Sequence, residues 1–318
     1  MDNKLKEILT KRILENISSN VKPVNYLTDV LDLGRESVYR RLNGQIDFSL
    51  DEILKLSTEL NFSLDDIHCE YDNYRAIFNL FRERSAPAEV SFNNMLHAFC
   101  NRMAEVYNSE RSHTGLALNR LLGTFYLHSE HLLKFIYYKW IHQFDEVSLN
   151  YYYCDLEVPE ETINMAHRAA FYQQRLDKSI IADENILSNT IQEIKYYQDR
   201  GLINDYEISL IKGELQNMLD NFQMILSTGQ SSTGAKWNVY LSSIDINSNS
   251  SYLQYDDNES VSFWIHSDSA FETTDKQMCV MQREWIESLK KYSTLITLSN
   301  QKMQADFLNQ QYNHLDKL

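Results

Sequence analysis

Glycine and proline are scarce in this chain, with 8 and 3 copies among 318 residues. Because these residues mark turns, their scarcity argues against a fold of many short strands and favours long, uninterrupted helices. Tyrosine and phenylalanine are abundant, with 20 and 14 copies, and 43% of the residues are apolar. This supply of apolar side chains excludes a chain that is disordered throughout. The length predicts two or three domains.

The four cysteines stand singly, at Cys69, Cys100, Cys154 and Cys279. They form no C-x-x-C pair and no tight disulfide framework, which favours a reducing cytoplasm. The first 17 residues carry charges throughout and lack the apolar stretch of a signal peptide. No 18 apolar residues run together, so no membrane-spanning segment is predicted. We expect a cytoplasmic protein without a membrane partner.

Sequence motifs for catalysis are missing. The chain has no G-x-G-x-x-G, no G-x-x-x-x-G-K and no G-x-S-x-G motif. His128 and His131, with Glu130 between them, could share a metal with a further ligand, but two histidines at this spacing more often belong to a core. We therefore expect no cofactor, no metal and no enzymatic activity. An enzyme in the C-terminal region is the alternative, and it would need a pocket with converging polar groups.

The first 68 residues show five short stretches with helical spacing of apolar residues. The residues 32–34 break the pattern once, and Asn43-Gly44 is a typical helix stop. Ser49 and Glu52 have the spacing of a capping box, which opens a helix. The expected helices cover residues 4–18, 24–31 and 35–43, and two more begin after Ser49 and after Ser63.

In this order the five helices resemble the DNA-binding domain of the Cro/lambda-repressor type, the XRE family, over residues 5–68. Three positions differ from the family's usual pattern: Thr28 stands in place of alanine, Asp32 in place of glycine, and Arg41 where an apolar or aromatic residue is common. The resemblance implies a helix-turn-helix fold whose partner is double-stranded DNA. The matching positions are Leu27, Val30, Leu31, Leu33, the segment 37–40, Asn43, Gly44, the segment 49–52, Leu60 and the segment 63–65.

In such a motif the second helix lies in the major groove, here the segment 35–43. Val38 and Leu42 are four residues apart and must face the core, which turns the polar residues outward. Arginine can grip guanine with two parallel bonds, and glutamate can accept from cytosine. The candidate DNA-binding residues are Arg35, Glu36, Ser37, Tyr39, Arg40, Arg41, Asn43 and Gln45.

Among these candidates, Ser37, Tyr39, Asn43 and Gln45 are expected to contact phosphates. Arg41 is expected to lay its stem across the core with its head group at a phosphate. The alternative is that all eight are solvated polar residues on a helical domain that binds protein.

The net charge of the chain is −15, a sign that opposes DNA binding. Residues 1–68 hold nine basic and twelve acidic side chains, a balance of −3, and the remainder holds 21 and 33, a balance of −12. Within 35–41 three arginines face one glutamate, a local +2. The sequence thus predicts little nonspecific affinity for DNA at physiological salt, and a homodimer would supply the missing affinity.

The remaining sequence divides where small polar residues gather, at 227–236. We expect a helix-turn-helix domain at 1–70, a helical effector and dimerisation region at 71–228, and an α+β region at 229–318. Alternating apolar residues from Trp237 to Ile265 predict a three-stranded antiparallel sheet there. The fold class is therefore mainly α. The aromatic residues of 135–140 and 151–153 suit either a plain core or dimer interface, which we favour, or a ligand pocket.

These observations predict a sequence-specific transcriptional regulator that binds DNA as a homodimer. Its C-terminal region would sense a small-molecule or protein effector. The alternative is a protein-interaction scaffold or signalling adaptor whose helix-turn-helix domain does not bind DNA.

Overall fold

The computed structural model describes residues 3–18, 20–65, 67, 76–80, 86–266 and 268–318. The contacts within the chain divide it into two units, Met1–Ile77 and Phe78–Leu318. Among the described residues, no helix is both long enough and apolar enough to cross a bilayer.

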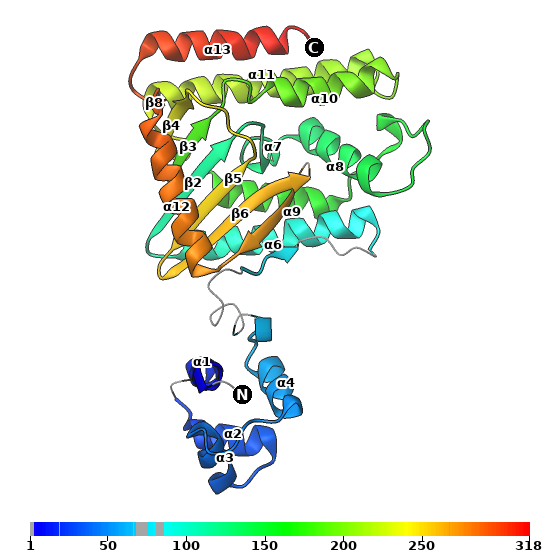
Figure 1. The fold of residues 1–318 in the computed structure, drawn as a ribbon. Coiled ribbons are helices and arrows are strands. Elements are labelled where there is room, and N and C mark those ends of the chain that lie inside the picture. Colours follow the sequence, from blue (N-terminus) through cyan, green and yellow to red (C-terminus); the bar gives the residue numbers. More distant parts are fainter. Residues whose placement is uncertain (1–2, 19, 66, 68–75, 81–85, 267) are drawn as a thin grey trace. The chain divides into compact units, whose positions relative to one another are not determined.

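The smaller unit consists of short helices around one core. Its helices are α1 (Asn3–Asn16), α2 (Pro23–Leu31), α3 (Arg35–Leu42) and α4 (Leu50–Glu59) (Figure 1). Each helix contributes one completely buried residue to this core: Ile13, Leu27, Val38 and Leu56. The fifth expected helix lies partly outside the described residues, and the described part of it is helical at 64–65 and 67.

The turn between α2 and α3 depends on Asp32. This residue has φ 54°, a left-handed conformation that a short polar side chain tolerates, and its N–H donates to the carbonyl of Thr28. The Thr28 hydroxyl donates in turn to the carbonyl of Val24, at 2.7 Å. Thr28 and Asp32, two of the positions that differ from the usual family pattern, are therefore compatible with the turn between α2 and α3.

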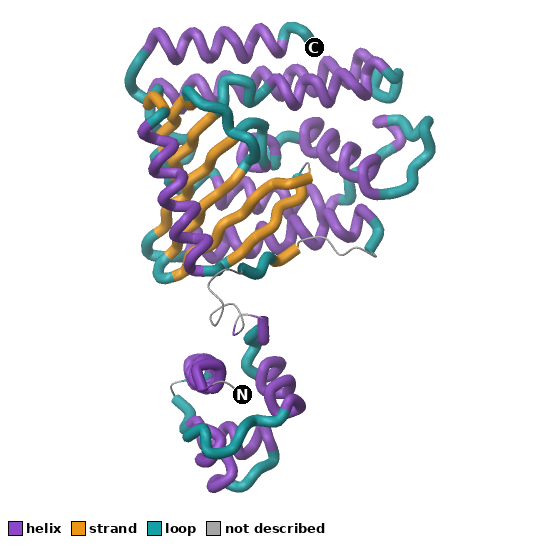
Figure 2. The backbone as a smooth tube through the Cα atoms, viewed as in Figure 1, coloured by secondary structure: helices purple, strands orange, loops and turns teal. Residues whose placement is uncertain are grey.

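The larger unit is built on one mixed eight-stranded sheet (Figure 2). The strand order is β1 (Asn79–Leu80), β7 (Ser269–Thr273), β6 (Asn258–His266), β5 (Ser250–Tyr255), β2 (Ser112–Leu118), β3 (Lys178–Ala182), β4 (Trp237–Ser242) and β8 (Ser293–Leu295). The pairs β2–β3 and β3–β4 are parallel, and the others are antiparallel.

The predicted three-stranded antiparallel sheet is wrong. Strands form at all three expected places, but β2 and β3 lie between β4 and β5, so the three strands are not a meander. All five residues of β3 are buried, and five of the seven of β2. Strands buried on both faces lack the alternation that reveals a strand in the sequence, which is why the sequence did not predict them. The C-terminal region therefore shares one large sheet with the middle of the chain.

Helices cover both faces of this sheet (Figure 1). One face carries α12 (Lys276–Lys291), which packs on β6, β5, β2, β4 and β8. The opposite face carries α6 (Ala88–Asn108), α7 (Gly123–Tyr126) and α9 (Glu160–Gln173). Further helices complete the unit: α8 (Glu130–Phe144), the 3-10 turn Tyr153–Asp155, α10 (Ser188–Asp199), α11 (Asp205–Thr228) and α13 (Gln301–Leu315).

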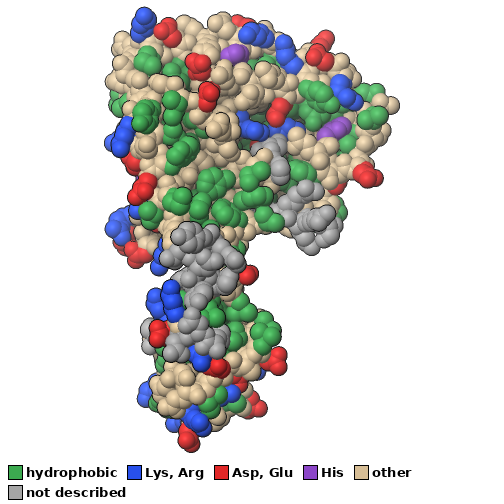
Figure 3. Space-filling model, viewed as in Figure 1, with side chains coloured by type: hydrophobic (Ala, Val, Ile, Leu, Met, Phe, Trp, Pro, Cys, Tyr) green, Lys and Arg blue, Asp and Glu red, His purple; other side chains and the backbone are tan. Residues whose placement is uncertain are grey.

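Exposed apolar side chains gather on the larger unit around α12 and β6, where Figure 3 shows a hydrophobic surface. Ile265 on β6 is 51% exposed, and Met281 and Trp285 on α12 are 61% and 40% exposed. Large apolar side chains exposed in one region of a surface are typical of interaction sites.

The close approach of α12 to β2 depends on Gly115. A Cβ at this position would lie 3.3 Å from Cδ1 of Ile286 on α12. We therefore expect Gly115→Val to lower the free energy of unfolding by about 1–3 kcal/mol, as overpacked cores do.

The Ile286→Ala change tests the contact. It should cost less stability in the Gly115→Val variant than in the wild type, with a coupling of at least about 1 kcal/mol. Chemical denaturation of the four proteins measures this coupling, and strictly additive costs would contradict the packing described.

Candidate functional site

The first candidate site is the outward face of α3. Glu36, Tyr39, Arg40 and Asn43 are exposed, and their i, i+3, i+4, i+7 spacing places them on one face of the helix. Val38, on the opposite side, is completely buried in the core of the smaller unit. The structure thus brings together four of the eight predicted DNA-binding residues on one accessible surface.

The remaining candidates lie around that surface. Arg35 is exposed at the N-terminus of α3, where its guanidinium donates to the side chain of Asn25 on α2, at 2.8 Å. Ser37 is half-buried, and Gln45 is exposed just beyond the helix, where its N–H donates to the carbonyl of Arg40. Arg40 itself makes no side-chain hydrogen bond or ion pair with the described residues.

Arg41 is held differently from Arg40. Its Nε and Nη2 donate to the two oxygens of Glu52, both at 2.9 Å, and the two side chains are only 14% and 16% exposed. Glu52 also completes the capping box with Ser49 at the start of α4, as the sequence predicted. Partial burial alone would raise the pKa of Glu52, but the hydrogen bonds from Arg41 and Ser49 lower it below its ordinary value. This ion pair joins α3 to α4.

The Arg41–Glu52 pair changes the charge balance of the candidate face. With Arg41 neutralised, two arginines, Arg35 and Arg40, stand against one glutamate, Glu36, which leaves a single net positive charge on the exposed part of the helix. This surface attracts phosphates only weakly, so any DNA recognition would have to come from its specific contacts.

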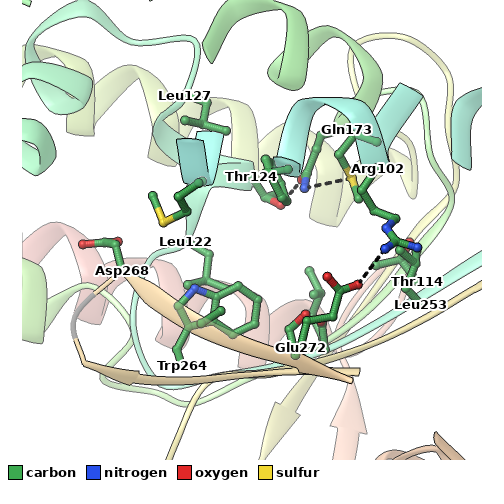
Figure 4. A pocket seen from close by; sticks show the side chains of 18 of the residues that line it. Arg102, Thr114, Leu122, Thr124, Leu127, Gln173, Leu253, Trp264, Asp268 and Glu272 are labelled. Carbon is green, nitrogen blue, oxygen red and sulfur yellow. Dashed lines mark hydrogen bonds and ion pairs between the residues drawn. The ribbon is translucent and has the colours of Figure 1, made fainter. Parts of the chain in front are cut away.

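The second candidate site is a cavity of about 130 Å³ in the larger unit, between the sheet and the helices α6 and α7 (Figure 4). Most of its wall is apolar, with Leu96 from α6, Leu122 and Leu127 at the two ends of α7, and Trp264 from β6. Thr114, Arg102 and Glu272 lie on one side, and Asp268 lies on the opposite side. Apolar cavities with a few convergent polar groups are the usual form of small-molecule sites.

Three charged groups in the wall, Arg102, Glu272 and Asp268, already have partners. Arg102 lies 3.5 Å from the carboxylate of Glu272 and donates to the hydroxyl of Tyr255. Burial alone would lower the pKa of Arg102, but Glu272 and Tyr255 outweigh burial and raise it. Asp268 accepts from the buried ammonium of Lys139 at 3.0 Å and from the Tyr126 hydroxyl, also at 3.0 Å.

Lys178, at the start of β3, differs from these charged groups because it has no ion-pair partner among the described residues. It is 2% exposed, its Nζ donates to the backbone carbonyl of Gln173, and it lies 4.2 Å from the centre of the Trp237 ring. Burial therefore lowers the pKa of Lys178 to about 7.

The sequence did not predict this cavity. The aromatic run that suggested a pocket lies in the core instead, where Phe135, Tyr137, Tyr138 and Trp140 are completely buried. A weak signal was present in β6, where the small Ser260 and Ser262 alternate with the apolar Val261 and Phe263.

No group of three or more metal-ligating side chains occurs among the residues that the structure describes.

Comparison with known proteins adds no family to these observations. No protein-family model matches the chain, and neither a curated protein nor a solved structure shows significant similarity to it.

The different settings of Arg40 and Arg41 predict different effects of the same substitution. Arg41→Met should lower the stability of the smaller unit by about 1–3 kcal/mol, because it leaves the half-buried carboxylate of Glu52 without its partner. Arg40→Met, at the neighbouring exposed position, should change stability by less than about 0.5 kcal/mol. Chemical denaturation measures both, and equal effects would contradict the assignment.

The burial of Lys178 predicts a pH-dependent stability. Its pKa is about 7 in the folded chain against 10.5 for an ordinary lysine, so between these pH values the unfolded chain binds the extra proton. The free energy of unfolding should therefore rise with pH in this window, by about 1.4 kcal/mol per pH unit from this group. Below the window the full penalty of the buried charge applies.

Lys178→Met removes that penalty. The variant should be more stable than the wild type near pH 7, and its advantage should shrink as the pH rises toward 10.5. Denaturation at about pH 7 and about pH 9 tests this, with the exposed Lys302→Met as the control. An advantage that does not change with pH would count against a buried, uncompensated amine.

Proposed function

We propose that the protein is a sequence-specific DNA-binding regulator of transcription that reads the major groove with α3. The observation that carries the proposal is the exposed face of α3, where Glu36 and Arg40 lie opposite the buried Val38. Tyr39 is exposed beside them, and Arg35 is exposed at the N-terminus of the helix. In helix-turn-helix proteins this part of the second helix meets the base edges.

The chemistry of this face supports base recognition more than general attraction to phosphates. Arg40 has no partner among the described residues, so its guanidinium is available for the O6 and N7 atoms of a guanine. Glu36 can accept a hydrogen bond from cytosine N4 and would repel a phosphate. Since only one net positive charge remains on this surface, nonspecific binding would be weak at physiological salt.

The proposal includes a homodimer in the cytoplasm. A single recognition helix contacts few base pairs, and two-fold pairing of protomers matches two half-sites. The exposed apolar surface around α12 and β6 supports an assembly role for the larger unit. The three described cysteines, Cys100, Cys154 and Cys279, are free thiols, which fits a reducing compartment.

The experiment is a selection of bound sequences from a random duplex pool, at a salt concentration of about 150 mM. The full chain should enrich a motif with two half-sites. The Arg35→Glu/Arg40→Glu variant should lose the enrichment, because both base-contacting cations are reversed.

A matched control separates recognition from overall charge. Lys276→Glu/Lys302→Glu makes the same change in net charge at exposed positions of the larger unit, and it should retain the motif. A folded wild type that enriches no motif would contradict the proposal and favour a protein-interaction scaffold. Enrichment that survives in the Arg35→Glu/Arg40→Glu variant would place recognition elsewhere.

A further inference from the structure

The cavity of the larger unit exists because small side chains occupy one face of the sheet. Ser251 on β5 and Ser262 on β6 are register partners, and both line the cavity. The residues next to them along the strands, Tyr252 and Val261, fill the opposite face under α12. The sheet is therefore well packed on the α12 side and hollow on the α6 side.

The size of the hollow limits what it can hold. A cavity of about 150 Å³ accommodates benzene, and the 130 Å³ observed is slightly smaller, which limits an occupant to about one ring or a short aliphatic chain. Leu122, Leu127 and Trp264 supply apolar wall for such a body.

Two polar groups in the wall lack a full set of partners, and they are neighbours. Thr114 on β2 and Lys178 on β3 are register partners across a parallel pair, and both line the cavity. Thr114 is 8% exposed, and its buried hydroxyl has no hydrogen-bond partner among the described residues. The Lys178 ammonium has three N–H donors, and one of them is hydrogen-bonded to the carbonyl of Gln173. The ammonium also lies against the face of the Trp237 ring.

The sign of the missing charge follows from the rest of the wall. Arg102 is paired with Glu272, and Asp268 is paired with Lys139. Lys178 is the charged wall residue without an opposite charge in the described part of the chain. Buried polar groups are nearly always paired in native proteins, so an unpaired hydroxyl beside an amine without a counterion indicates an absent acceptor with negative charge.

We propose that this cavity binds a small monocarboxylic acid, whose carboxylate accepts hydrogen bonds from Lys178 and Thr114 and whose ring or short chain fills the apolar hollow. Burial supports this assignment, since the lowered pKa of Lys178, about 7, reflects a charge that lacks a counterion. Binding of the acid is independent of DNA, whereas its role as an effector rests on the proposed function.

Isothermal titration calorimetry of the full chain near pH 6.5 tests the binding, with benzoate and hexanoate as probes. Benzyl alcohol and 1-hexanol are their uncharged counterparts of nearly the same shape. At least one of the acids should bind with one molecule per chain, and its alcohol should bind about 10-fold or more weakly, because it cannot form a charge-assisted bond.

Three variants locate the site. Lys178→Met should weaken binding of the acid at least about 10-fold, and Thr114→Val about 3- to 10-fold, in line with the loss of a charged and a neutral hydrogen bond. Thr114→Val preserves the shape and removes only a hydroxyl without a partner, so it should fold normally. The exposed Lys302→Met should leave binding unchanged.

The inference is overturned if the folded wild type binds neither acid, if the alcohols bind as well as the acids, or if the Thr114→Val and Lys178→Met variants bind like the wild type. Repeating the duplex selection with a saturating amount of the acid separates the two proposals. Acid binding without any enriched duplex would uphold the cavity and reject the DNA reader. An enriched duplex without acid binding would do the reverse.

Discussion

The bidentate ion pair between Arg41 and Glu52 illustrates the constraint on which both units depend, that a charge taken out of water needs a partner. In the larger unit the same constraint pairs Lys139 with Asp268 and Arg102 with Glu272. These pairs hold helices and strands together and are structural. Because such pairing is the rule, a polar group that lacks a partner indicates a place where a ligand can bind.

Each of the two candidate sites contains a polar group without a partner among the described residues. On α3, Arg40 is exposed without a partner beside the fixed Arg41, so the helix presents one guanidinium to solvent and uses the next to hold its position. In the cavity, the uncompensated amine of Lys178 lies beside the unpaired hydroxyl of Thr114. Both sites combine a rigid, fully paired support with a small number of available donors, which is the arrangement that specific binding requires.

The sequence predicted what is encoded locally and missed what depends on distant segments. The spacing of Val38 and Leu42 gave the orientation of α3, and the Ser49–Glu52 capping box forms as predicted. The strands β2 and β3 were not predicted because they are buried on both faces and their sequences show no alternation of apolar and polar residues. The cavity could not be predicted at all, because Thr114, Lys178 and Ser262 meet only through the register of strands far apart in the chain.

The central claim is that Arg35 and Arg40 on α3 contact base edges in the major groove. Guanine N7 lies in that groove and is methylated by dimethyl sulfate, so methylation protection on the selected duplex is the most direct measurement. The account predicts protected guanines in each half-site with the wild type, and the loss of protection at one guanine per half-site with Arg40→Ala. Protection that is absent, or identical in the variant, would contradict it.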